Sequence, residues 1–105
     1  MIEEFRTERL VYLQADGRFT TLYYITELQV LKNISATLNI GQFKRCLPPF
    51  FYRTHKNYIV NLKYLEKTVN HKKDSCYISL SVGGLYIPVS GRRRTNFLKS
   101  AIRIK

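Results

Sequence analysis

The chain has little of what a secreted, metal-binding or membrane-spanning protein needs. Its two cysteines, Cys46 and Cys76, stand far apart and form no CxxC motif, so we expect reduced, packed thiols and no metal site. No apolar run approaches the roughly 18 residues of a membrane-spanning helix. The first four residues, Met1 to Glu4, are acidic where a signal peptide would be basic, which predicts a cytoplasmic protein.

Acidic residues are also scarce: the chain of 105 residues has seven Asp and Glu against 18 Lys and Arg, a net charge of +11. Residues 1–42 hold four basic and five acidic residues, whereas residues 43–105 hold fourteen basic residues and only Glu66 and Asp74 as acids. This asymmetry favours a polyanionic partner, nucleic acid before a membrane surface. Without paired carboxylates, a nucleophile motif beside His55 or His71, or a glycine-rich phosphate loop, we expect no enzyme and no cofactor.

Short strand patterns between close turn signals predict a mainly β fold, with antiparallel strands in small packed sheets and one or two short helices. No repeat or linker divides the chain, so residues 1–105 are predicted to form a single domain. The expected strands are Leu10–Ala15, Arg18–Ile25, Ile34–Leu38, Phe50–Tyr52, Tyr58–Val60, Tyr64–Val69, Cys76–Val82 and Leu85–Val89. We expect turns at Asp16-Gly17, Lys32-Asn33, His71–Ser75 and Gly83-Gly84.

Two helices are expected. The first covers Ile40–Cys46, with Asn39 as its N-cap and Pro48-Pro49 after its end. The second follows Ser90, because apolar residues recur at helical spacing near the C-terminus. The core is predicted to contain Phe51, Tyr58, Ile59, Val60, Leu80, Ile87, Val89 and Phe97.

Three polar segments are candidates for nucleic-acid contact. Arg92-Arg93-Arg94 falls in the first turn of the expected last helix, where guanidinium groups suit phosphates and guanine edges. Thr54 to Asn57 interrupts two strand pieces, so it should project as a loop; Lys56 suits guanine or phosphate, and Asn57 suits adenine. The alternative is that His55 or Asn57 only caps a backbone turn. Arg18, with Thr20 and Thr21 behind it, is the third candidate.

These segments belong to three blocks that together resemble the LytTR DNA-binding domain. The blocks are Ala15–Thr21, Phe50–Asn61, and Ile87–Ser90 followed by basic residues and Phe97-Leu98, in the family's order; the resemblance spans roughly Leu10 to Ser100. It implies a bacterial transcription regulator of a two-component system, whose β-domain reads double-stranded DNA with loops that enter the grooves. The DNA-binding residues that it implies are Arg18, Thr20, His55, Lys56, Asn57, Arg92, Arg93 and Arg94.

The resemblance also implies partners: paired direct repeats of DNA, with a receiver domain ahead of this domain in a longer protein or a homodimer on DNA. No receiver domain is expected within these residues. Gly91 stands where the family usually has a basic residue, so Arg92 or Arg94 can take over that contact. The stretch Thr26–Asn33 is longer than the family's usual hairpin, and the usual first strand is missing or shortened.

Two other functions compete with DNA binding. A basic RNA-binding module would need exposed aromatic rings for base stacking, whereas the aromatics here alternate like core residues. A module for anionic membrane surfaces would use the segment from Arg92 to Lys105, which has few apolar residues for anchoring. Arg53, Lys63 and Arg93 are expected to contact the DNA backbone.

Overall fold

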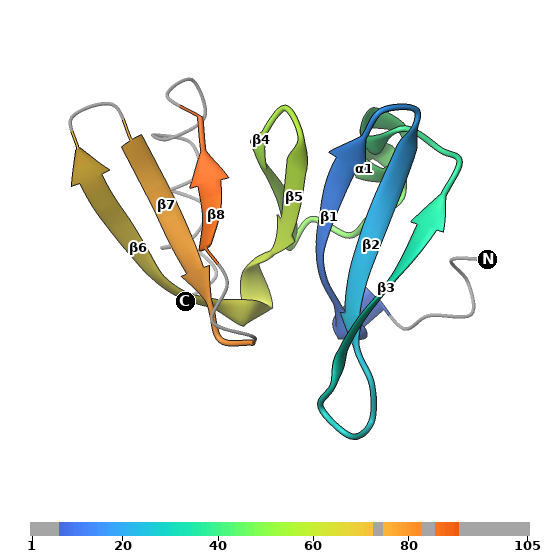
Figure 1. Ribbon diagram of the computed structural model, residues 1–105, viewed down its shortest axis with the longest axis horizontal. Coiled ribbons are helices and arrows are strands. Elements are labelled where there is room, and N and C mark those ends of the chain that lie inside the picture. Colours follow the sequence, from blue (N-terminus) through green and yellow to red (C-terminus); the bar gives the residue numbers. More distant parts are fainter. Residues whose placement is uncertain (1–6, 73–74, 83–85, 91–105) are drawn as a thin grey trace.

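The computed structural model describes residues 7–72, 75–82 and 86–90, which form two antiparallel sheets and one short α-helix (Figure 1). The larger sheet has the order β3-β2-β1-β5-β4, and the smaller has the order β6-β7-β8. The larger sheet consists of β1 (Leu10–Asp16), β2 (Phe19–Ile25), β3 (Leu31–Ala36), β4 (Phe51–His55) and β5 (Tyr58–Asn61). The smaller consists of β6 (Leu65–Lys72), β7 (Ser75–Leu80) and β8 (Tyr86–Val89). The predicted mainly β, antiparallel fold is confirmed.

A hydrophobic cluster lies on each face of the five-stranded sheet, because the side chains of a strand point to both faces; only the edge strand β3 is largely exposed. One cluster lies between the two sheets and contains Val11, Tyr12, Ile25, Val60, Leu62, Leu65, Ile78, Leu80, Ile87 and Val89. The other lies under the helix α1 (Ile40–Cys46) and contains Leu10, Leu13, Leu22, Ile40, Phe43, Phe51 and Ile59. The predicted core is confirmed except at two positions: Tyr58 is only half-buried, and Phe97 lies outside the described residues.

The helix α1 begins where the sequence predicts. The Asn39 side chain accepts a hydrogen bond from the Gln42 backbone N–H at 2.9 Å, and the Gln42 side chain accepts one from the Asn39 N–H at 2.9 Å. This reciprocal pair satisfies two of the helix's free amide groups. Ile40 and Phe43 occupy the buried face. Cys46, the last residue of α1, is exposed, so the expected packed thiol is wrong at this position.

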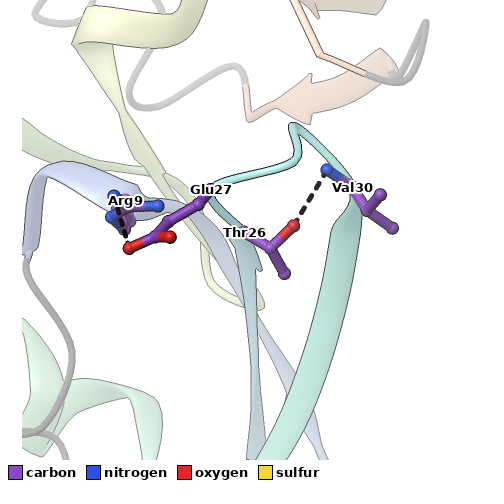
Figure 2. Close-up of polar contacts among 4 residues, drawn as sticks. All are labelled: Arg9, Thr26, Glu27 and Val30. Atoms are coloured by element: carbon purple, nitrogen blue, oxygen red, sulfur yellow. Dashed lines mark hydrogen bonds and ion pairs between the residues drawn. The ribbon is translucent and has the colours of Figure 1, made fainter.

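The β2–β3 hairpin turns earlier than the sequence suggested. Its turn is closed by two backbone hydrogen bonds, from Thr26 N–H to Val30 at 2.9 Å and from Gln29 N–H to Thr26 at 2.9 Å. The Thr26 hydroxyl also accepts a bond from the Val30 N–H at 3.2 Å (Figure 2). The expected turn Lys32-Asn33 therefore lies inside β3, opposite Tyr24 and Tyr23.

Two short 3₁₀ turns complete the described chain. The first, η2 (Thr7–Arg9), precedes β1, and Arg9 forms an ion pair with Glu27 of the β2–β3 turn at 4.0 Å (Figure 2). The second, η3 (Leu62–Tyr64), joins the two sheets. It is preceded by the buried Asn61, whose side chain donates to the Leu10 carbonyl at 2.8 Å and accepts from the Lys63 N–H at 2.9 Å. Asn61 therefore fixes the point at which the chain passes from one sheet to the other.

Candidate nucleic-acid interface

The predicted contact segments come together at one end of the five-stranded sheet. β1 is antiparallel to both β2 and β5, which places the β1–β2 turn beside the β4–β5 turn. The Ala15 N–H, just before the first turn, donates to the Asn57 carbonyl in the second at 2.8 Å. Ser90, at the end of β8, donates its backbone N–H to the Thr54 carbonyl at 2.7 Å. We call this region, comprising residues 16–19, 55–58 and 90, the turn end; it lies at the top of Figure 1.

The β1–β2 turn presents Arg18 to solvent. Asp16 pairs with Phe19, so Gly17 and Arg18 form a two-residue loop. Gly17 has a φ of 62°, in the left-handed region that glycine adopts without steric cost. Arg18 is exposed, as a contact residue must be.

Thr20, which the resemblance implied as a DNA-binding residue, is not exposed at the turn end. It is completely buried, and its hydroxyl donates a hydrogen bond to the Leu38 carbonyl at 2.8 Å. This bond ties the start of β2 to the segment just before α1. Thr20 therefore supports the turn end from inside and does not face a ligand.

The β4–β5 turn is shorter than the predicted loop, because β4 continues through His55 and leaves only Lys56 and Asn57 in the turn. Both side chains are exposed. The turn is held from within: Arg53 Nη2 donates to the Lys56 carbonyl at 2.6 Å, and the Asn57 N–H donates to His55 Nδ1 at 3.2 Å. The sequence left open whether His55 or Asn57 caps this turn; in the structure the His55 side chain accepts the hydrogen bond.

β4 contains a bulge just before the β4–β5 turn. The register between β4 and β5 shifts between Tyr52 and His55, so the extra residue lies at Arg53 or Thr54. Thr54 is completely buried, whereas the side chain of Arg53, the residue before it, extends to the Lys56 carbonyl in the turn.

Among the described residues, the buried hydroxyls of Thr54 and Ser90 have no hydrogen-bond partner.

Aromatic contacts anchor the turn end to the core. The His55 ring meets the Tyr58 ring edge-on, with centroids 5.9 Å apart, and Tyr58 lies 6.5 Å from Tyr12. Tyr12 in turn stacks on Tyr23 at 4.3 Å. Burial is the main cause that raises the pKa of Tyr12 well above its usual range, and the adjacent Tyr23 raises it further. The Tyr12 hydroxyl therefore stays neutral. The turn is therefore connected to the core by a row of contacting aromatic rings.

The remaining sequence-predicted residues fall elsewhere. Lys63 lies in η3, beyond the end of β5 that is far from the turn, and its Nζ sits 4.3 Å from the centre of the Phe50 ring. It is therefore not part of the turn end. Arg92, Arg93 and Arg94 lie outside the described residues, although Ser90, which they follow closely in sequence, is at the turn end. The hydrogen bond from Arg53 to the Lys56 carbonyl was not predicted from the sequence.

Other chemistries find little support in the described part of the chain. No group of three or more His, Cys, Asp and Glu residues lies together there as a metal site would require. No helix in residues 7–72, 75–82 and 86–90 is long and apolar enough to cross a membrane. Two described aromatic rings are well exposed, Phe19 at 49% and Tyr86 at 60%, and they belong to different sheets. A continuous platform for base stacking would need such rings side by side.

The family is decided by comparison with known proteins. A model of the LytTr DNA-binding domain matches residues 2–102. The chain belongs to the LytTR family of DNA-binding domains. The same fold occurs in the LytTr DNA-binding domain of a Bacillus cereus protein described as a methyl-accepting/DNA response regulator. That match has a TM-score of 0.79 and 22% sequence identity, and it covers 91% of this chain and 84% of the other. Curated protein sequences gave no match.

Proposed function

We propose that this LytTR domain binds double-stranded DNA in a sequence-specific way, with the turn end entering the grooves. The observation that supports it is the convergence of three segments from distant parts of the sequence at one end of the sheet. Exposed Arg18, Lys56 and Asn57 lie there, and the chain leads from Ser90 into three successive arginines. Loops fixed by a β-scaffold are a common way to present binding residues.

The roles of the residues follow from their chemistry. Lys56 and Asn57 are suited to base edges, because lysine pairs with guanine and asparagine pairs bidentately with adenine. Arg18, Arg92 and Arg94 are proposed groove or near-groove contacts, and Arg93 is proposed to meet a phosphate. His55 acts through the shape of the turn. Thr20 is not included, because it is buried.

The biological setting is proposed from the family. LytTR domains are DNA-binding domains, and the Bacillus cereus protein is described as a response regulator. We therefore propose that this domain works in the bacterial cytoplasm as a transcription regulator of a two-component system, without enzymatic activity or cofactor. Binding to paired direct repeats, as a homodimer or joined to a receiver domain, is part of the same proposal.

The test is a titration of the protein with duplex DNA, single-stranded RNA and anionic vesicles, each at several salt concentrations. If the turn end meets four to eight phosphates, the slope of log K against log salt for duplex DNA should be about −4 to −7. A duplex selected from a random library should bind more tightly than unselected duplex. A nearly flat salt dependence, or tighter binding of RNA or vesicles, would contradict the proposal.

Arg93→Ala tests whether Arg93 contacts a DNA phosphate or a base. Loss of one phosphate contact should weaken selected and unselected duplexes by the same factor and reduce the salt slope by about one. A loss seen only with the selected duplex would instead make Arg93 a base-reading residue.

A further inference from the structure

A basic hollow lies between α1 and β4, beside the β4–β5 turn. Its volume is about 650 Å³, and it is open to solvent. Six residues line it: Asn39, Gly41, Gln42, Lys44, Arg45 and Arg53. Three of the six carry positive charge and none is acidic. Lys44 and Arg45 lie in α1 and belong to none of the three segments of the turn end.

Arg53 connects this hollow to the turn end. Its Nη2 donates to the Lys56 carbonyl at 2.6 Å, while a Cβ placed on Gly41 would lie 3.9 Å from its Nη1. The guanidinium therefore lies between the turn and the start of α1. The Thr20 hydroxyl, bonded to the Leu38 carbonyl, ties the segment before α1 to the same end of the sheet. Figure 1 shows α1 behind the upper parts of β1 and β2.

We infer that this hollow binds a backbone phosphate of the duplex held at the turn end, which extends the interface onto α1. The inference rests on the proposed function. Phosphates follow each other about every 3.4 Å of axis along each strand, so a duplex whose groove receives Lys56 and Asn57 presents further phosphates close to Arg53. Ammonium and guanidinium groups without a carboxylate among them are suited to phosphate oxygens. Contact here carries no sequence information; it fixes the orientation of the domain on the duplex.

The first test replaces the cations of α1 one at a time, with an unselected duplex as the probe. Lys44→Ala and Arg45→Ala should each weaken binding about three- to ten-fold and reduce the salt slope by about one. The selected duplex should lose the same factor. Lys32→Ala is the matched control, because Lys32 is an exposed lysine in β3 and does not line the hollow; it should leave binding within about two-fold.

A second variant, Gly41→Glu, fills the hollow with a carboxylate. A Cβ at Gly41 would meet its neighbours at 3.4 Å and 3.9 Å, so a side chain fits at ordinary contact distances. An acidic residue in the first turn of a helix is favourable, so the fold should keep its thermal midpoint. We expect unselected duplex to bind about ten-fold more weakly, because the new carboxylate competes with phosphate for the three cations.

The outcomes separate this inference from the proposed function. If the unmodified protein binds duplex with a steep salt slope and all three variants leave affinity and slope unchanged, the hollow is not a phosphate site and the proposed function stands. An equal loss with Lys32→Ala would show an effect of net charge alone and overturn the inference. A loss confined to the selected duplex would make this a base-reading surface, which also overturns it. If the unmodified protein binds no duplex, both proposals fail.

Discussion

The two ends of the five-stranded sheet differ in chemistry, although β2 runs into a hairpin turn at each. At the turn end, Arg18 is exposed in the β1–β2 turn. Backbone hydrogen bonds join Ala15 to Asn57 in the β4–β5 turn, and Ser90 to Thr54 in β4. At the other end, the β2–β3 turn exposes Leu28 at 85%, and its Glu27 pairs with Arg9 (Figure 2).

The difference is what leads us to propose the turn end as the DNA-binding end. The turn end combines the exposed cations Arg18 and Lys56 with backbone hydrogen bonds from Ala15 to Asn57 and from Ser90 to Thr54; a loop held in this way loses less conformational freedom on binding than an unsupported one. The β2–β3 turn is closed by bonds within itself, and it offers an apolar tip with a carboxylate beside it. The two ends therefore differ in the sign of their exposed charge and in whether neighbouring strands are hydrogen-bonded to the turn.

The largest contrast is expected in stability. Phe43, on the buried face of α1, is almost completely buried, whereas Leu28 in the β2–β3 turn is exposed. Phe43→Ala should lower the free energy of unfolding by about 3–5 kcal/mol, because it leaves a cavity in the core. Leu28→Ser should change it by less than about 0.5 kcal/mol. Chemical denaturation measures both, and an equal effect of the two changes would mean that the β2–β3 turn is packed as firmly as α1.

The next contrast concerns recognition. Lys56→Ala and Asn57→Ala should each cost about 1–3 kcal/mol of binding free energy on a selected duplex and much less on an unselected one. Glu27→Ala, at the opposite end, should leave the preference between the two duplexes unchanged. Fluorescence anisotropy titrations give these values, and each variant is first checked for a native unfolding transition. If Lys56→Ala and Asn57→Ala weakened both duplexes equally, the turn would position the protein without reading sequence.

A pair of threonines gives a smaller contrast. Thr20→Val keeps the shape but leaves the Leu38 carbonyl without its hydrogen bond, which should cost about 1–2 kcal/mol of stability. Thr26→Val removes a bond to the exposed Val30 N–H, which water can replace, and should cost less than about 0.5 kcal/mol. Thermal unfolding in parallel separates them. A larger loss at Thr26 would contradict the view that the turn end is the more firmly supported one.

The smallest effect is expected at Cys46, the exposed last residue of α1. Cys46→Ser should change the free energy of unfolding by less than about 0.5 kcal/mol, and reductant or a chelator should not alter duplex binding. Loss of binding on chelation would point to a metal ion that the account does not include.

The fold could be predicted where local chemistry dominates. Asp16-Gly17 marks its hairpin because glycine readily adopts a positive φ, and Asn39 marks the start of α1 because its side chain can cap the helix. The β2–β3 turn was missed because Lys32-Asn33 looks like a turn in sequence. The actual turn uses a threonine hydroxyl and Gln29 at a φ of 64°, which a non-glycine residue rarely adopts.

The exposed residues of the candidate site could be predicted from the sequence, whereas the hydrogen bonds that hold its turns in place could not. Lys56 and Asn57 were identified by residue type and position between strands, and both are exposed. The buried Thr20 hydroxyl donates to the Leu38 carbonyl, eighteen positions away in the chain, and Arg53, which donates to the Lys56 carbonyl, lies in the irregular part of β4. Such contacts are decided by tertiary packing, which no local pattern contains. The DNA contacts themselves remain predictions.

We propose that DNA meets the turn end and not the opposite end of the sheet. The most direct measurement follows the backbone amide signals of the protein by NMR while duplex DNA is added. Signals from Gly17, Arg18, Lys56, Asn57 and Ser90 should shift or broaden, while those of residues 27–30 in the β2–β3 turn should stay in place. Shifts concentrated at residues 27–30, or absent from the turn end, would contradict this placement of the DNA.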